Sequence, residues 1–101
     1  MKQKENCKKI NIVCDRRLDK YFALSKKALK IAKKSINKER KKDAEELLNM
    51  AELYLKDAEH FRKQGHYVNA FAAINYSHGW IDSASRLGLI KVKDNKLFVL
   101  K

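Results

Sequence analysis

Four polar residues recur at three- and four-residue steps in the last third of this 101-residue chain: Asn75, His78, Asp82 and Arg86. On a helix these spacings place the side chains on one face, within reach of one another. A carboxylate between an imidazole and a guanidinium can orient the histidine for proton transfer, or the group can hold an anion. We favour a structural alternative, in which Asp82 pairs with Arg86 and His78 hydrogen-bonds nearby. A ligand or partner site is second and catalysis third.

Two aromatic residues, Tyr76 and Trp80, lie among these polar residues and are expected to form core or interface. They belong to an apolar arc that covers about half of a helical wheel: Tyr67, Ala70, Ala73, Ile74, Tyr76, Trp80, Ile81, Ala84 and Leu87. A helix with so wide an arc must be covered on more than one side. Gly79 costs roughly 1 kcal/mol relative to alanine inside a helix, which predicts that something approaches the backbone there. A neighbouring helix is the default candidate, and a ligand is the alternative.

Residues that could bind a metal are sparse elsewhere. Cys7 and Cys14 have six residues between them and lack both the two-residue spacing and the second cysteine pair of a zinc site. A disulfide is conceivable, but we expect structural or incidental thiols, because disulfides belong to oxidising compartments and to some hyperthermophiles. His60 and His66 flank a predicted turn and should be exposed or cap a helix. We therefore predict no metal site and no cofactor.

The chain is strongly basic, with 24 Lys and Arg against 12 Asp and Glu and a formal net charge of +12. Nine basic residues fall between Lys26 and Lys42, and six acidic residues follow between Asp43 and Glu59. The simplest interpretation is a solvated surface on which the two blocks neutralise each other. The alternative is a nucleic-acid surface, with these candidate residues: Lys26, Lys30, Lys33, Lys34, Lys38 and Lys41. Because the block lacks interleaved aromatic residues that stack on bases, such binding should be weak and without sequence preference.

Apolar residues recur at helical spacing in three segments, and the chain has no proline and only three glycines. The pattern predicts helices over about Asp15–Asn37, Lys42–Lys63 and Tyr67–Leu87. Asp15 should cap the first helix by accepting hydrogen bonds from its free amides. Gly65 should end the second helix by adopting a left-handed conformation, so that the chain returns antiparallel.

The segment after Gly88 alternates apolar residues with lysines, which is typical of strands. Asp94-Asn95 suits a two-residue hairpin turn. In that register two apolar pairs oppose each other: Ile90 with Val99, and Val92 with Leu97. We predict an all-α protein, a three-helix up-down-up antiparallel bundle over residues 15–89 with the third helix most buried. A basic segment, residues 1–14, precedes the bundle, and a short C-terminal β-hairpin, residues 90–101, follows it.

One pattern is specific enough to suggest a family. The chain contains His-Gly-Trp-x-Asp-x-x-x-Arg-Leu-Gly, formed by His78, Gly79, Trp80, Asp82, Arg86, Leu87 and Gly88. This pattern, within the segment from Gly65 to Leu89, resembles the archaeal domain-of-unknown-function 357 family, and a looser likeness reaches back to about Leu18. The resemblance implies a small helical bundle from an archaeon. It brings no activity, cofactor or catalytic residue.

Three functional classes follow from these observations. A non-enzymatic interaction module, self-associating as a homodimer through the third helix, leads, because an apolar arc beyond the needs of the core suits an interface. A nucleic-acid-binding protein comes second, on charge alone. A helical-bundle ribonuclease of the HEPN type is third and disfavoured, since such enzymes place an arginine before the histidine, whereas Arg86 follows His78.

Membrane insertion is not expected from the sequence. No apolar run approaches the roughly 20 residues that a membrane span needs, and residues 1–9 lack the hydrophobic region of a signal peptide. We therefore expect a cytoplasmic protein that does not bind membranes.

Overall fold

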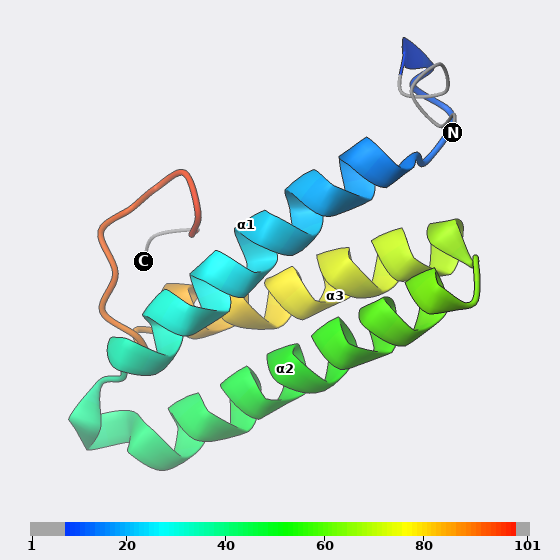
Figure 1. The fold of residues 1–101 in the computed structure, drawn as a ribbon. Helices are drawn as coiled ribbons and strands as arrows, with labels where there is room; N and C mark the ends of the chain where they lie inside the picture. The colour runs from blue at the N-terminus through cyan, green and yellow to red at the C-terminus, as the bar shows by residue number, and fades with distance from the viewer. Residues whose placement is uncertain (1–7, 99–101) are drawn as a thin grey trace.

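Three long helices form the molecule in a computed structural model that describes residues 8–98. Helix α1 (Asp15–Lys34) is followed by a single 3-10 turn, η2 (Lys38–Arg40), and then by α2 (Lys41–Lys63) and α3 (Tyr67–Arg86). Consecutive helices run in opposite directions, as the colours in Figure 1 show. The predicted all-α, up-down-up bundle is therefore confirmed, with helix bounds within three residues of the predicted ones. Within the described range no helix is long and apolar enough to cross a membrane.

The two glycines with positive φ end the last two helices in the same way. Gly65 has φ 83° and Gly88 has φ 76°. After α2 the amide of His66 donates to the carbonyl of Phe61 at 2.9 Å, and the amide of Gly65 donates to Arg62 at 2.9 Å. This pair of bonds is the Schellman motif, and Leu89 and Gly88 form the same pair after α3. The predicted role of Gly65 is confirmed, and Gly88 acts likewise.

The core is densest between α2 and α3, which pack together far more extensively than either helix packs on α1. Their buried positions are rich in small residues that let the helices approach closely: Ala44, Ala51 and Ala58 on α2, and Ala70, Ala73, Ser77 and Ala84 on α3. The buried Ser77 hydroxyl donates to the carbonyl of Ala51 at 2.6 Å, so its polar atom is satisfied inside the core. Helix α1 adds larger apolar side chains, including Leu18, Phe22 and Leu29.

Asp15 does not cap α1, contrary to prediction. Cys14 occupies the N-cap position, and no side chain caps this helix. The Asp15 carboxylate instead accepts a hydrogen bond from the Tyr67 hydroxyl and another, at 3.2 Å, from Arg62. These partners on α3 and α2 offer a charge-assisted contact that outweighs a local cap. The bond from Tyr67, reinforced by Arg62 and opposed by burial, lowers the pKa of the Asp15 carboxyl.

The C-terminal segment does not form the predicted hairpin, and residues 8–98 contain no β-strand. Ile90 makes an isolated antiparallel bridge with Ile36 in the α1–α2 connection. The Asp94 carboxylate accepts hydrogen bonds from the amides of Lys96 at 2.8 Å and Leu97 at 3.3 Å. Such side-chain bonds to the local backbone compete with strand pairing and close a turn. The predicted partner Val99 lies outside the described residues.

This closed turn directs the C-terminal segment back onto the helices. Leu97 and Phe98 are both buried, and the segment lies beside α1 in Figure 1. Three of the apolar residues that were predicted to face each other across a hairpin therefore pack against the bundle: Ile90, Val92 and Leu97. Burial against preformed helices removes more apolar surface from water than an isolated two-stranded ribbon does.

Cys14 is fully buried at the start of α1 and is disulfide-bonded, so the expectation of a thiol is wrong for this residue. Cys7, the other cysteine of the chain, lies outside the described residues. A disulfide is compatible with an oxidising compartment and also with the cytoplasm of some heat-adapted organisms.

Candidate functional site

His78 connects three parts of the molecule. Its Nε2 lies 2.8 Å from the carbonyl oxygen of Leu97 in the C-terminal segment, and its Nδ1 lies 3.3 Å from the hydroxyl of Ser25 on α1. A carbonyl oxygen can only accept, so Nε2 bears the proton. In the neutral ring Nδ1 then accepts from Ser25. His78 thus holds the C-terminal segment over α1 and α3.

The predicted polar row of Asn75, His78, Asp82 and Arg86 is brought together in part, because the first three residues line one pocket and Arg86 lies outside it. The carboxylate of Asp82 lies 3.7 Å from His78 Nε2, whereas Arg86 and Asn75 are exposed. The predicted pairing of Asp82 with Arg86 is not found among the ion pairs of residues 8–98. Arg86 instead borders a separate shallow hollow with Asp82, Ser83 and Leu87.

A pocket of about 330 Å³ opens beside His78. Its lining comes from all three parts that His78 connects: Tyr21, Leu24 and Ser25 of α1, Asn75, His78, Gly79 and Asp82 of α3, and Lys96 and Leu97 of the C-terminal segment. Both ring nitrogens of the histidine already have protein partners. The geometry therefore favours an anchoring role for His78 and gives the ribonuclease hypothesis no support.

The solvent side of α3 is nearly free of charge. Among the exposed residues of α3 only Arg86 is charged, whereas eight of the ten exposed residues of α1 are. The exposed positions that follow one helical row along α3 and its C-cap residue define what we call the α3 outer face: Val68, Ala72, Tyr76, Gly79, Ser83 and, at the C-cap, Leu87. The larger residues of this face are well exposed, Val68 at 71%, Tyr76 at 56% and Leu87 at 55%. The apolar arc predicted from the sequence is therefore wider than the bundle covers.

An aromatic hollow of about 530 Å³ borders the α3 outer face where α2 and α3 meet. The ring of Tyr76 packs edge-on against Tyr54 of α2, with centroids 4.5 Å apart, and against Trp80 at 6.3 Å. Trp80 is half-buried, and its indole Nε1 is buried with no hydrogen-bond partner among the described residues. Of the two predicted core or interface aromatics, Trp80 thus belongs partly to the core and Tyr76 to the surface.

Gly79 has no neighbour that explains it. A Cβ atom added at this position would meet nothing within 4 Å. The predicted close approach of a neighbouring helix is therefore not found within residues 8–98, although Gly79 borders the pocket beside His78 that α1 also lines. The approach of a ligand stays a prediction. The glycine is an exposed helical residue facing open space.

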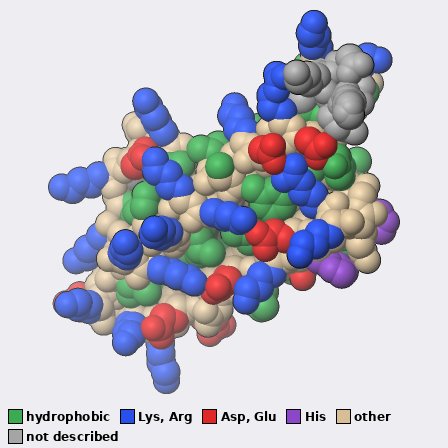
Figure 2. Space-filling model, viewed as in Figure 1, with side chains coloured by type: hydrophobic (Ala, Val, Ile, Leu, Met, Phe, Trp, Pro, Cys, Tyr) green, Lys and Arg blue, Asp and Glu red, His purple; other side chains and the backbone are tan. Residues whose placement is uncertain are grey.

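The candidate lysines are partly neutralised by α2. Lys26 pairs with Glu59 and Lys33 with Glu52, each at 2.7 Å, as expected for charged blocks that face each other on antiparallel helices. The other four candidates are exposed and take part in no ion pair within residues 8–98: Lys30, Lys34, Lys38 and Lys41. Figure 2 shows Lys and Arg side chains gathered at the end where α1 leads into α2.

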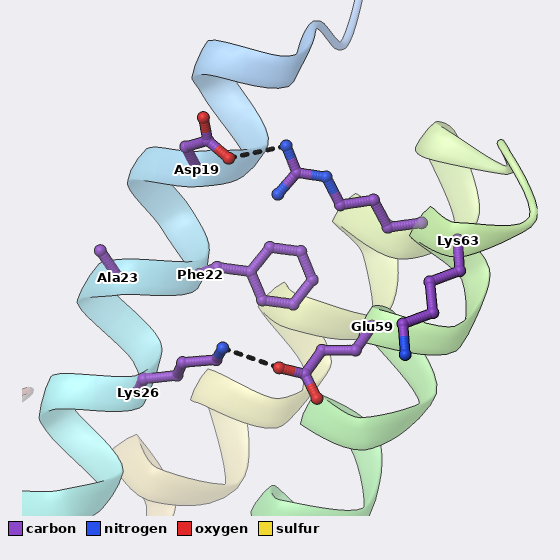
Figure 3. A pocket seen from close by; sticks show the side chains of 7 residues that line it. Asp19, Phe22, Ala23, Lys26, Glu59 and Lys63 are labelled. Carbon is purple, nitrogen blue, oxygen red and sulfur yellow. Dashed lines mark ion pairs between the residues drawn. The ribbon is translucent and has the colours of Figure 1, made fainter.

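A groove between α1 and α2 was not predicted from the sequence. It encloses about 540 Å³, and Figure 3 shows the Phe22 ring at its centre. On one side of the ring Arg62 pairs with Asp19 at 2.6 Å, and on the other Lys26 pairs with Glu59. The cationic groups of Lys26 and Arg62 each lie 5.6 Å from the ring centroid, within the range of cation–π contacts. These contacts hold α1 to α2. In the sequence their only signal is the spacing of opposite charges on the two helices.

Comparisons with known proteins complete the description of the site. Among residues 8–98 no three His, Cys, Asp or Glu side chains gather where they could hold a metal ion. Neither a curated protein nor a solved structure matches the chain. A family model described as "Protein of unknown function (DUF357)" matches residues 20–90, which include the polar row and the α3 outer face. The chain therefore belongs to the DUF357 family.

Proposed function

We propose that the protein is a non-enzymatic interaction module that forms a homodimer through the α3 outer face. The supporting observation is the near absence of charge on the exposed side of α3, in a chain of which 36% of the residues are charged. The buried centre of a protein interface is depleted in charged residues and enriched in aromatic ones. Val68, Tyr76 and Leu87 supply the apolar contacts, and the hollow beside Tyr54 offers space for a side chain of the partner.

The net charge favours a second copy that approaches through this face. Two chains of charge +12 repel each other, and the repulsion is strongest where lysines meet lysines. Helix α1 packs on a different side of α3, through Tyr21 against Phe71 and Ser25 against His78. Pairing through the α3 outer face therefore keeps the two lysine-rich α1 surfaces apart.

Analytical ultracentrifugation over a range of protein concentrations tests the proposal. Wild-type protein should show a monomer–dimer equilibrium that strengthens as salt screens the repulsion. Tyr76→Glu should stay folded and become monomeric. Leu53→Glu is the matched control, because Leu53 on α2 is 55% exposed but lies outside the α3 outer face and the aromatic hollow. A wild-type protein that is monomeric at all concentrations would falsify the proposal.

Nucleic-acid binding is the second candidate function. It is supported by the four exposed lysines without ion pairs, Lys30, Lys34, Lys38 and Lys41, near the end where α1 leads into α2. Fluorescence anisotropy with a duplex and a single strand should detect weak binding that is lost between about 50 and 200 mM salt. Tight binding at physiological salt would place this function first. The two candidates respond to salt in opposite directions, so one salt series separates them.

A further inference from the structure

We infer that the two copies pair with their α3 helices antiparallel, in one register, with Tyr76 of each copy packed over Gly79 of the other. This inference rests on the homodimer proposed above and specifies its geometry. It explains three features that the isolated chain leaves without a purpose: the order of residues on the α3 outer face, the glycine inside α3, and the unpaired charges beside it.

The order of residues on the α3 outer face is the first argument. Successive positions from Val68 to Leu87 are separated by four, four, three, four and four residues, and this spacing is the same in either direction. If two α3 helices pair antiparallel about the centre of this row, every position on one helix therefore faces a position of the same row on the other. The facing pairs, whose numbers all add up to 155, are Val68 with Leu87, Ala72 with Ser83, and Tyr76 with Gly79.

The sizes of the facing residues agree with this register. Apolar Val68 lies opposite apolar Leu87, small Ala72 opposite small Ser83, and the largest residue, Tyr76, opposite the smallest, Gly79. Alternating large and small residues is how facing helices interdigitate. A parallel pair would instead place each residue opposite itself, so two Tyr76 rings would collide beside an empty space at the two glycines.

Gly79 is the second argument. Glycine inside a helix costs roughly 1 kcal/mol relative to alanine. Residues 8–98 offer no compensation, since Gly79 is exposed and an added Cβ would meet nothing within 4 Å. In the antiparallel pair the bare backbone at Gly79 receives the Tyr76 ring of the second copy, so the two helices can approach closely.

Charge is the third argument. In the same register Arg86 of one copy lies opposite Asn69 of the other. Asn69 and Asp57 both line the aromatic hollow, so this register brings Arg86 to the level of the hollow that contains the Asp57 carboxylate. Neither Arg86 nor Asp57 takes part in an ion pair within residues 8–98 of a single copy. The two-fold symmetry of the pair forms this contact twice.

Complementary charge reversal in the full-length protein tests the register. Arg86→Asp places aspartates opposite each other in a homodimer, and Asp57→Arg places arginines opposite each other. Each variant alone should dimerise at least about tenfold more weakly than wild type, because facing like charges repel. An equal mixture of the two variants should recover dimers, since both contacts of the mixed dimer then join opposite charges. Sedimentation velocity measures all three samples, and circular dichroism confirms that each variant is helical.

The outcomes separate the register from the proposed function. If wild type dimerises, Tyr76→Glu does not, and the mixture dimerises no better than each variant alone, the antiparallel register is wrong while the homodimer stands. If wild type does not dimerise, both proposals fail. Gly79→Leu provides a second test, because the open space around Gly79 lets the monomer fold normally. Its side chain should exclude Tyr76 of the second copy and abolish the dimer, and an undiminished dimer would overturn the predicted contact.

Discussion

Helices α1 and α3 have the same length, 20 residues, and run in the same direction, yet they present opposite surfaces to solvent. The exposed side of α1 is almost entirely charged, and some of its lysines reach across to carboxylates of α2. The exposed side of α3 carries a single charge, on Arg86. A small basic bundle thus has one helix with a charged outer surface and another with a largely uncharged outer surface, on which the proposed homodimer depends.

The same two helices differ in how they are held. Helix α3 packs along α2 through small buried residues, while α1 packs less extensively and depends more on discrete polar links. These links join Lys26 to Glu59, Ser25 to His78, and Asp15 to both Arg62 and Tyr67. The free energy of unfolding should therefore respond strongly to mutations at buried positions of α3 and weakly to mutations at its exposed positions. Mutations in the polar links of α1 should have intermediate effects that are smaller than those in the α3 core.

The largest effect is expected at Ile74, which is fully buried on α3. Ile74→Ala should lower the free energy of unfolding by roughly 2 to 5 kcal/mol, because it removes buried methyl groups and leaves a cavity. Val68→Ala, on the exposed side of the same helix, should change it by less than about 0.5 kcal/mol at concentrations where the protein is monomeric. Chemical denaturation measures both, and equal losses would show that the two sides of α3 do not differ as described.

The sequence predicts the helices well because their information is local. Apolar residues at three- and four-residue steps mark the buried side, and Gly65 marks the end of α2 through its backbone conformation. Periodicity also gave the width of the apolar arc on α3. It does not tell how much of the arc the bundle covers, so Tyr76 and Leu87 could not be placed at the surface.

The features that were missed depend on contacts between distant residues. Asp15 looks like a helix cap because its partners, Arg62 and Tyr67, lie 47 and 52 residues away. The alternation of residues after Gly88 resembles a hairpin in which Leu97 faces Val92. In the structure Leu97 instead packs in the core of the bundle and accepts a hydrogen bond from His78. His78 was misjudged for the same reason. Its three- and four-residue spacing from Asn75 and Asp82 predicts contacts within α3, whereas its hydrogen bonds join it to Ser25 and Leu97.

The second largest effect is expected at His78. His78→Ala should lower the free energy of unfolding by about 1 to 3 kcal/mol, because it leaves a carbonyl and a hydroxyl without their partner. Hydrogen exchange should quicken at the amide of Phe98, which the turn at Asp94 protects. Asn75→Ala is the control from the same polar row, since Asn75 is exposed. Unchanged exchange in residues 91–98 would contradict the anchoring role of His78.

A smaller, pH-dependent effect is expected at Asp15. The folded protein lowers the pKa of this carboxyl below 3.8, so the ionised form contributes stability that is fully present at neutral pH. The contribution is lost as pH falls through the folded-state pKa, in acid below about pH 4. Asp15→Asn should cost about 1 kcal/mol at pH 7, a modest amount because water screens the half-exposed carboxylate.

Denaturation of Asp15→Asn and wild type across the acidic range checks this sign. The difference between them should shrink as pH falls, because wild type loses the same charge by protonation. Asp43→Asn is the control, since the Asp43 carboxylate forms its one ion pair within residues 8–98 with the exposed Arg40, three residues away. A difference that stays constant from pH 7 to the acid limit would mean that Asp15 stabilises the fold by something other than its charge.

The smallest effect on stability is expected at Gly79. A mutation there tests the contrast between α1 and α3 most directly. Gly79→Ala should raise the free energy of unfolding of the monomer by roughly 0.5 to 1 kcal/mol, because alanine favours the helix and its methyl group enters open space. In the proposed register the same methyl group lies under Tyr76 of the second copy, so it should weaken the homodimer. Ala23→Gly on α1 is the reciprocal control, because it should lower stability by a similar amount and leave dimerisation unchanged. A residue that destabilises the monomer but strengthens the dimer is what a contact surface requires. A Gly79→Ala variant that gains stability and dimerises as before would show that the glycine serves no partner.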